Sequence, residues 1–270
     1  ALDHRQGVGE PGIGLQHVGI PVDAREHRQV RGEDRLHLRH LGRRQVPREL
    51  HRLLLVLGER GDRDLPAADA GGGGIAAQNQ PAALYNAMIS PVTNFTIKGF
   101  LWYQGESNAG RPEEYAKLQP AQIIDWRNKW KQGELPFLYA QLPGFMDYNY
   151  LPAESQWATL RESQLKSLSV PNTGMAVTID LGEWNDIHPD NKKDVGERLA
   201  LLAEKIAYGE NIVYSGPLFE SSKIESNKII IAFKNIGSGL TSNDGEELSE
   251  FAIAGADKKF FWAKAKIEGD

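Results

Sequence analysis

Strand-like segments alternate with helix-like segments in the middle of this chain, and this alternation constrains its fold more than any other feature. The predicted strands span residues 96–103, 136–142 and 174–181, and the predicted helices span residues 82–89, 112–131, 157–167 and 191–208. Strands that are joined by helices form parallel βαβ units with right-handed crossovers. The sequence therefore predicts an α/β fold built on a doubly wound parallel sheet.

The last part of the chain changes to a β-rich pattern. Short apolar segments separated by turn-forming residues span residues 212–219, 228–234, 251–253 and 260–267. Short strands without intervening helices are typical of antiparallel pairs. We therefore expect residues 79–215 to form the α/β core and residues 216–270 to form a small, truncated β-rich accessory unit.

Residues 1–78 differ in composition from the rest of the chain. They contain 12 Arg and no Lys, and they lack Ser, Thr, Asn, Met and every aromatic residue, whereas the remainder contains 15 Lys and 4 Arg. A domain without aromatic rings or hydroxyl side chains is difficult to pack and to cap. A disordered arm and a basic nucleic-acid-binding tail are alternatives, but scattered acidic residues argue against the tail. We favour a segment that is foreign to the native reading frame.

Local features of residues 1–78 do not indicate a catalytic or metal-binding site. Residues 53–57 (LLLVL) fit a buried strand or a short helix, and the glycines at 71–74 suit a flexible junction. Six of the seven histidines lie before residue 52 without recognisable ligand spacing. We expect their side chains to be solvated rather than to bind metal.

Composition and charge exclude several classes of partner. A net charge of −5 gives no reason to expect nucleic acid or an anionic membrane as a partner. No apolar run approaches the roughly 18–20 residues that a membrane helix needs. The absence of Cys excludes disulfides and thiolate metal sites. The N-terminus lacks a signal-peptide pattern, so we expect that any export signal of the native protein lies outside this chain.

Two polar loops follow predicted strands, which is where ligands bind in open α/β sheets. The first comprises residues 102–109 (WYQGESNA), and the second comprises residues 185–189 (NDIHP). His188 is the only histidine after residue 78, and imidazole is well suited to activate a hydroxyl nucleophile near neutral pH. Asp186 is the nearest carboxylate that could fix its tautomer.

Other interpretations of His188 stay open from sequence alone. Asp180 or Glu183 could be the acid instead of Asp186, and the histidine could cap the following helix. The pattern Asp186-x-His188-x-Asp190 would place three metal ligands on one side of an extended segment. The proline between His188 and Asp190 disrupts a regular strand, so we predict no metal site.

Several stretches are similar to the bacterial sialate O-acetylesterase family of SGNH hydrolases. They are residues 84–89 (LYNAMI), 98–109 (KGFLWYQGESNA), 157–164 (WATLRESQ), 185–189 (NDIHP) and 192–199 (KKDVGERL). The Trp-x-Gln-Gly-Glu-Ser run and the Asp-Ile-His-Pro run are specific when they occur together in this order, whereas either alone is weak. The resemblance extends over residues 79–270.

The resemblance implies a flavodoxin-like SGNH hydrolase with a three-layer sheet, incomplete here, that removes O-acetyl groups from sugars without metal or cofactor. His188 is then the catalytic base, with its ring in a cleft beside the turn at residues 104–106. Gln104 and Gly105 would contribute donors to the oxyanion hole, as acyl transfer requires. Glu106 would orient that loop, or serve as a buried structural carboxylate.

The resemblance also suggests how a substrate is held. Trp184, in the histidine loop, is the candidate for stacking on a sugar, because Trp102 and Tyr103 end a strand and are expected in the core. Arg161 could bind a substrate carboxylate, although an ion pair with Glu162 or a neighbouring helix is the favoured alternative. The implied partner is sialic acid or another acetylated carbohydrate, and the implied location is periplasmic or secreted. The oligomeric state is not predicted.

Two departures from the family pattern affect the catalytic machinery. Asn185 stands three residues before the histidine, where related enzymes often have the acid, so a Ser–His dyad aided by a backbone carbonyl is an alternative to Asp186. The family nucleophile is a serine in a Gly-Gln-Ser-Asn motif, which this sequence lacks, and the first serine is Ser90. We therefore expect little or no esterase activity from this chain.

Two rival functions follow from these departures. Residues 105–110 (GESNAG) come close to the Gly-x-Ser-x-Gly nucleophile elbow of α/β-hydrolases, with Ser107 as the nucleophile. Ala109 replaces the second glycine of that motif, and Pro112 opens the helix too late for the sharp turn. The second rival is a non-catalytic carbohydrate-binding fragment.

Overall fold

The structure is a computed structural model that describes residues 55–58, 80, 82–147, 149–242, 245–257 and 259–269. The expected domain boundary at residue 79 and the glycines at 71–74 lie outside the described residues, as do residues 243–244 among the turn-forming residues of the β-rich part. The same is true of the six histidines before residue 52, and of all the compositionally distinct segment except residues 55–58.

A parallel sheet with the strand order β1-β2-β3-β4 forms the centre of the fold. The strands are β1 (Leu55–Gly58), β2 (Phe100–Tyr103), β3 (Phe137–Ala140) and β4 (Thr173–Ala176). Each neighbouring pair is parallel, so the prediction of a parallel α/β sheet is confirmed. Within residues 53–57, for which strand and helix were both considered, the described part is a strand.

The main helices of the core lie close to their predicted positions. They are α1 (Pro112–Trp130), α2 (Gln156–Lys166) and α3 (Lys192–Ile206). A proline fits the first turn of α1 because its fixed φ suits a helix start and its missing N–H is not needed there. Lys131 ends α1 in a left-handed conformation with φ of 54°. The side chain of Ser155 caps α2 by accepting a hydrogen bond from Ala158 N–H at 3.3 Å.

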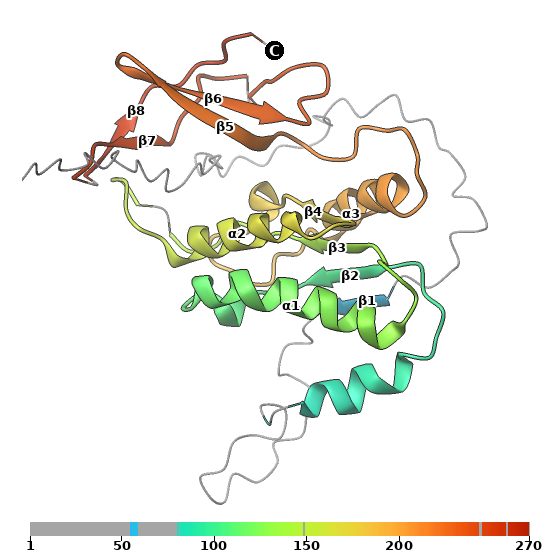
Figure 1. Cartoon of the computed structure of the whole chain (residues 1–270). Coiled ribbons are helices and arrows are strands. Elements are labelled where there is room, and N and C mark those ends of the chain that lie inside the picture. The colour runs from blue at the N-terminus through green and yellow to red at the C-terminus, as the bar shows by residue number, and fades with distance from the viewer. Residues whose placement is uncertain are drawn as a thin grey trace, which may run out of the picture.

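Alternating side chains of β3 define the two faces of the sheet. Phe137 and Tyr139 pack in a cluster with residues of α1, whereas Leu138 and Ala140 pack in a cluster with residues of α3. The helices therefore form the outer layers and the sheet forms the middle layer (Figure 1). Gly174 of β4 allows α3 to lie close, because a Cβ there would be 2.6 Å from Cδ1 of Ile206.

The predicted boundaries differ from the structure in two places in the core. The strand predicted over residues 174–181 ends at Ala176, and a short 3-10 helix, Ile179–Leu181, follows. The buried hydroxyl of Thr178 donates a hydrogen bond to the carbonyl of Gln141, and this bond turns the chain at that point. The helix predicted over residues 82–89 continues through a 3-10 turn, Ser90–Val92.

The C-terminal part forms two antiparallel hairpins, as its β-rich pattern predicts. They pair β5 (Leu218–Glu225) with β6 (Lys228–Lys234), and β7 (Phe251–Ala254) with β8 (Phe260–Ala263). The strand predicted over residues 212–219 overlaps β5 only at residues 218 and 219. Pro217 has no N–H to donate to a ladder, and the strand begins directly after it.

Candidate active site

The histidine loop, residues 182–191, lies between the end of the sheet and α3 and is held by its own hydrogen bonds. The backbone N–H of His188 donates to a carboxylate oxygen of Asp186 at 2.7 Å, and the backbone N–H of Asp190 donates to Oε1 of Glu183 at 2.9 Å. Glu183 and Asp186 also form an isolated antiparallel bridge. Two of the candidate acids therefore shape the loop that carries the base.

The imidazole of His188 has the geometry of a loosely held base. Its Nδ1 lies 3.9 Å from the carboxylate oxygen of Asp186, which is longer than a hydrogen bond. The side chain is 64% exposed, so the ring borders solvent rather than lying within a closed cleft. Catalytic hydrogen bonds are often long before substrate binds, so this distance is compatible with an acid–base pair.

The glutamine loop, residues 104–109, follows β2 and is held by hydrogen bonds from side chains of α1 and α2. Tyr115 donates a hydrogen bond from its hydroxyl to the carbonyl of Gln104 at 3.0 Å, and Nε2 of Gln164 donates to the same oxygen at 3.3 Å. The N–H of Gly105 donates to the carboxylate of Glu106 at 2.8 Å. Gly105 has φ of 154°, a conformation that side chains disfavour.

Both predicted oxyanion donors therefore have partners within their own loop. Besides the bond from Gly105 to Glu106, Nε2 of Gln104 donates to Oδ1 of Asn108 at 3.1 Å. Glu106 therefore holds the loop by accepting the hydrogen bond from the backbone N–H of Gly105. The single N–H of Gly105 must leave Glu106 before it can bind an oxyanion, whereas the Nε2 of Gln104 carries two hydrogens, of which the bond to Asn108 uses one.

One apolar cluster brings the two loops together. Ile187 of the histidine loop and Ala109 of the glutamine loop both pack against a buried cluster, which consists of Tyr115, Leu142, Trp157 and Leu160. Near the same edge, Nζ of Lys192 lies 5.3 Å from the ring centroid of Tyr103. Both polar loops thus lie on one cluster at the carboxyl ends of the strands, where ligands bind in parallel sheets.

Asp180, another candidate acid, is engaged elsewhere. Both of its carboxylate oxygens accept hydrogen bonds from the guanidinium of Arg198 at 2.6 Å. Burial alone would raise the pKa of Asp180, but the hydrogen bonds and positive charge of Arg198 outweigh it and hold this pKa below its ordinary value. The carboxylate ties α3 to the end of the sheet.

The remaining predicted residues differ in exposure. Ser107 is exposed within a short 3-10 helix, Glu106–Asn108, and the Trp184 side chain is 59% exposed. The loops around Trp184 are packed tightly, because a Cβ on Gly182 would lie 2.0 Å from the carbonyl oxygen of Gly144.

Arg161 projects from α2 beside the cluster that supports both loops. The predicted ion pair with Glu162 was wrong, because Glu162 pairs with Lys166 at 2.9 Å. Among the described residues, no carboxylate forms an ion pair with Arg161. Burial lowers the pKa of Arg161 to about 10, so its guanidinium stays charged at neutral pH. A cation without an ion-pair partner can accept an anionic group from a ligand.

Sequence reasoning missed the supporting role of Gln164. Gln164 is fully buried, and its side chain bonds the N–H of Leu142 at 2.8 Å as well as the glutamine loop. The signal in the sequence was its position, because Gln164 follows Trp157 and Leu160 at the spacing that places all three on the buried face of α2. The hydroxyl of Tyr103 is buried with no hydrogen-bond partner among the described residues. Burial first, and then the charge of Glu106, raise the pKa of Tyr103 to about 12.

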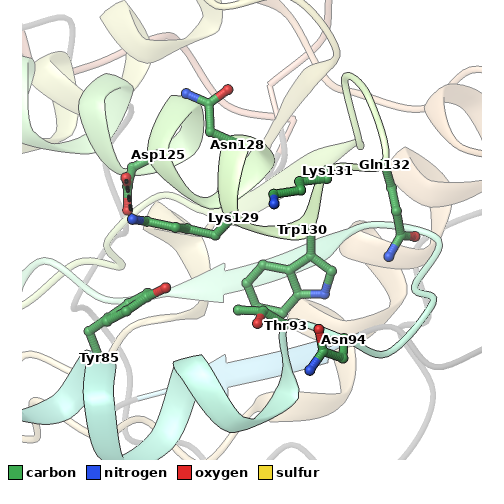
Figure 2. Close-up of a pocket in the computed structure, with 9 residues that line it drawn as sticks. All are labelled: Tyr85, Thr93, Asn94, Asp125, Asn128, Lys129, Trp130, Lys131 and Gln132. Atoms are coloured by element: carbon green, nitrogen blue, oxygen red, sulfur yellow. Dashed lines mark ion pairs between the residues drawn. The ribbon is translucent and has the colours of Figure 1, made fainter.

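A separate hollow lies at the opposite edge of the sheet (Figure 2). Its lining includes Tyr85, Asn94, Lys129, Trp130 and Gln132. Since α1 begins after the carboxyl end of β2 and ends before β3, its last turn marks the amino-terminal edge. The hollow is therefore remote from the histidine loop.

Two kinds of feature are absent from the part of the chain that the structure describes. No group of three or more His, Asp or Glu side chains there could hold a metal ion. No helix there has the length and apolar character to cross a membrane.

Comparisons with known proteins agree with this architecture. Residues 65–205 match the family described as "Carbohydrate esterase, sialic acid-specific acetylesterase". The sialate O-acetylesterase of Mus musculus is 37% identical over an alignment of 163 residues that covers 53% of this chain and 30% of that protein. The Homo sapiens protein of the same name is 34% identical over an alignment of 173 residues that covers 57% of this chain and 33% of that protein.

A solved structure is also similar. It is a carbohydrate acetylesterase from Xanthomonas citri, with a TM-score of 0.65 and 46% sequence identity. The similarity covers 69% of this chain and 43% of that one. The chain thus spans less than half of the length of each of these relatives.

Proposed function

Because the chain belongs to the carbohydrate esterase family of sialic acid-specific acetylesterases, we propose that it acts on O-acetyl esters of sialic acid or of another acetylated carbohydrate. The observation that supports this proposal is that the histidine and glutamine loops pack on the same buried cluster, through Ile187 and Ala109. A base and a set of oxyanion donors are the two parts of an esterase that must lie side by side.

In the proposed reaction, a serine oxygen attacks the acetyl carbonyl while His188 takes the hydroxyl proton and passes it to the sugar oxygen as the ester bond breaks. Water, deprotonated by His188, then releases acetate from the acetyl-serine, and His188 returns the proton to the serine oxygen. Asp186 stabilises the imidazolium, which requires the 3.9 Å contact to shorten by about 1 Å to reach hydrogen-bond length. Gly105 stabilises the oxyanion once its N–H is released from Glu106, and Gln104 donates the Nε2 hydrogen that does not bond Asn108.

The nucleophile is the incomplete part of this proposal. The sequence contains no Gly-Gln-Ser-Asn motif. Without an activated serine, a positioned histidine retains only a small part of its effect on rate. We therefore propose that this chain binds acetylated sugars and hydrolyses them slowly or not at all.

The assignment of His188 as the catalytic base can be tested by measuring acetate release from O-acetylated sialic acid and from p-nitrophenyl acetate. Any release should disappear in His188→Ala and persist in Lys193→Ala, which changes another exposed side chain near the start of α3. Release that survives in His188→Ala would contradict the assignment of the base. Clear, His188-dependent turnover would contradict the expected impairment.

A test of binding does not need the nucleophile. We propose that Arg161 contacts the carboxylate of sialic acid and that Trp184 stacks on the sugar. Arg161→Gln should then weaken binding of O-acetylated sialic acid, measured by ligand-observed NMR, but should leave a neutral O-acetylated sugar unaffected. Trp184→Ala should weaken both. Absence of binding to either sugar would overturn the proposed function.

A further inference from the structure

Exposed aromatic and apolar side chains gather beside the histidine loop. Met146 is 57% exposed, Tyr150 82%, Leu151 73%, Trp184 59% and Trp262 46%. Soluble proteins rarely expose large contiguous apolar patches unless these are functional. Three of these five side chains are Trp or Tyr, which combine an apolar face with a polar tip.

Backbone contacts link these side chains in space. The N–H of Met146 donates to the carbonyl of Trp184 at 2.9 Å, which joins the loop after β3 to the histidine loop. The indole N–H of Trp262 donates to the carbonyl of Tyr150 at 3.0 Å, which joins the β7–β8 hairpin to the same loop. In Figure 1 this hairpin lies beside the loop that joins β3 to α2.

Trp184, Met146, Tyr150 and Trp262 are thus linked as a row. Tyr150 follows Met146 by four residues, so their Cα atoms lie at most about 14 Å apart. The row runs from Trp184 of the histidine loop, through the loop after β3, to Trp262 of the β7–β8 hairpin.

We propose that Trp184, Tyr150 and Trp262 form one extended carbohydrate-binding surface. The acetylated sugar lies at His188 and Trp184, and the next sugars of the same glycan lie over Tyr150 and Trp262. This inference rests on the proposed function and narrows its substrate class from a free acetylated sugar to one within a glycan chain.

The chemistry of the row favours a sugar over other occupants. The C–H faces of pyranose rings stack on aromatic rings while their hydroxyl groups stay in water. The bond of Trp262 to Tyr150 holds its indole before a ligand arrives, which lowers the entropic cost of binding. The described part of the loop carries two exposed charged residues, Asp147 and Glu154, and both disfavour an anionic membrane surface.

The same hairpin supplies a matched control. Phe261 neighbours Trp262 in β8, so its side chain points to the opposite face, and it is 67% exposed. Phe261→Ala therefore removes an exposed ring of similar character away from the row. Tyr150→Ala complements Trp262→Ala, because it removes a ring but keeps the carbonyl to which Trp262 bonds.

The experiment measures Kd by calorimetry for O-acetylated sialyllactose and O-acetylated xylotriose, each against its own acetylated monosaccharide. At least one trisaccharide should bind more tightly than its monosaccharide, and loss of either ring should weaken that trisaccharide by about three- to tenfold. The same substitutions should leave the monosaccharide unchanged, and Phe261→Ala should change neither.

The outcomes separate this inference from the proposed function. Equal Kd values for both trisaccharides and their monosaccharides would overturn the extended surface and leave the proposed function standing. Binding of none of these compounds would overturn both. If Trp262→Ala instead abolished self-association measured by analytical ultracentrifugation, the surface would be a contact between copies of the chain, and the inference would be wrong.

Discussion

The carboxylate of Asp186 accepts a hydrogen bond from the backbone N–H of His188 at 2.7 Å, while Nδ1 of the same histidine lies 3.9 Å from that oxygen. The Asp186 carboxylate thus holds the loop by its bond to the backbone of His188, and it also lies near the imidazole ring, but beyond hydrogen-bond length. The backbone bond makes the position of His188 depend on Asp186 even before the ring contact shortens.

Replacing Asp186 with Ala should change the tautomer of His188. An acceptor near Nδ1 favours the tautomer that carries its proton there, and Asp186→Ala removes this acceptor. Asp186→Asn keeps an acceptor oxygen without the charge, so we expect an intermediate result. Imidazole ¹⁵N chemical shifts measure the tautomer directly. Identical shifts in the three proteins would show that Asp186 does not orient the ring.

Replacing Ser107 with Ala distinguishes the two esterase mechanisms. Ser107 is exposed and lies in a short 3-10 helix, so Ser107→Ala should leave folding intact. Under the proposed SGNH mechanism, any acetate release should also stay within about twofold, since Ser107 does not attack. Loss of all release in Ser107→Ala, matching that in His188→Ala, would instead assign Ser107 as the nucleophile.

Local patterns in the sequence predicted the core elements well. The helix expected over residues 112–131 is α1, Pro112–Trp130, because proline at its start and glycine after its end act locally. The strand ending near Leu181 was overextended, because a contact from Thr178 to a distant carbonyl turns the chain. Tertiary contacts of this kind are not visible in a local pattern.

The sequence led us to expect the two loops at one edge of the sheet, but it could not give their hydrogen bonds. The expectation came from the rule that ligands bind at the carboxyl ends of parallel strands. The pairing of Asp180 with Arg198 and the hydrogen bonds from Gln164 to Leu142 and Gln104 join residues far apart in sequence. Such pairings depend on how α2 and α3 pack on the sheet.

The pair between Asp180 and Arg198 should make stability depend on pH. The pKa of Asp180 is lower in the folded state, so the pair stabilises the fold above the unfolded pKa of about 4 and is lost as pH falls through the folded pKa. Because the two side chains are 33% and 35% exposed, we expect Asp180→Asn to cost only about 1 kcal/mol at pH 7.

Urea unfolding at pH 7 and at pH 3 measures this effect, and the difference between wild type and Asp180→Asn should shrink at the lower pH. Glu197→Gln is the matched control, since Glu197 pairs with Lys193 at 3.3 Å on an exposed surface and should change stability by less than about 0.5 kcal/mol. An equal effect of both variants at pH 7 would refute the special role of Asp180.

Gly182 lies so close to Gly144 that replacing Gly182 with Ala should destabilise the fold. Gly182 has φ of −86° and ψ of 168°, which alanine adopts readily, so the cost of Gly182→Ala comes from the 2.0 Å contact with the Gly144 carbonyl and not from backbone strain. The backbone must move apart, and we expect a loss of about 2 kcal/mol or more.

The control for this substitution is Gly196→Ala, because Gly196 lies in α3 with open space around its Cα. Alanine there should stabilise the protein by about 0.5–1 kcal/mol, through helix propensity. Thermal unfolding measures both changes.

Gly182 begins the histidine loop, and the loop after Gly144 carries the N–H that bonds Trp184, so Gly182→Ala should also weaken binding of acetylated sugars. A Gly182→Ala protein as stable as wild type, with unchanged sugar binding, would show that the contact between these loops does not position the site.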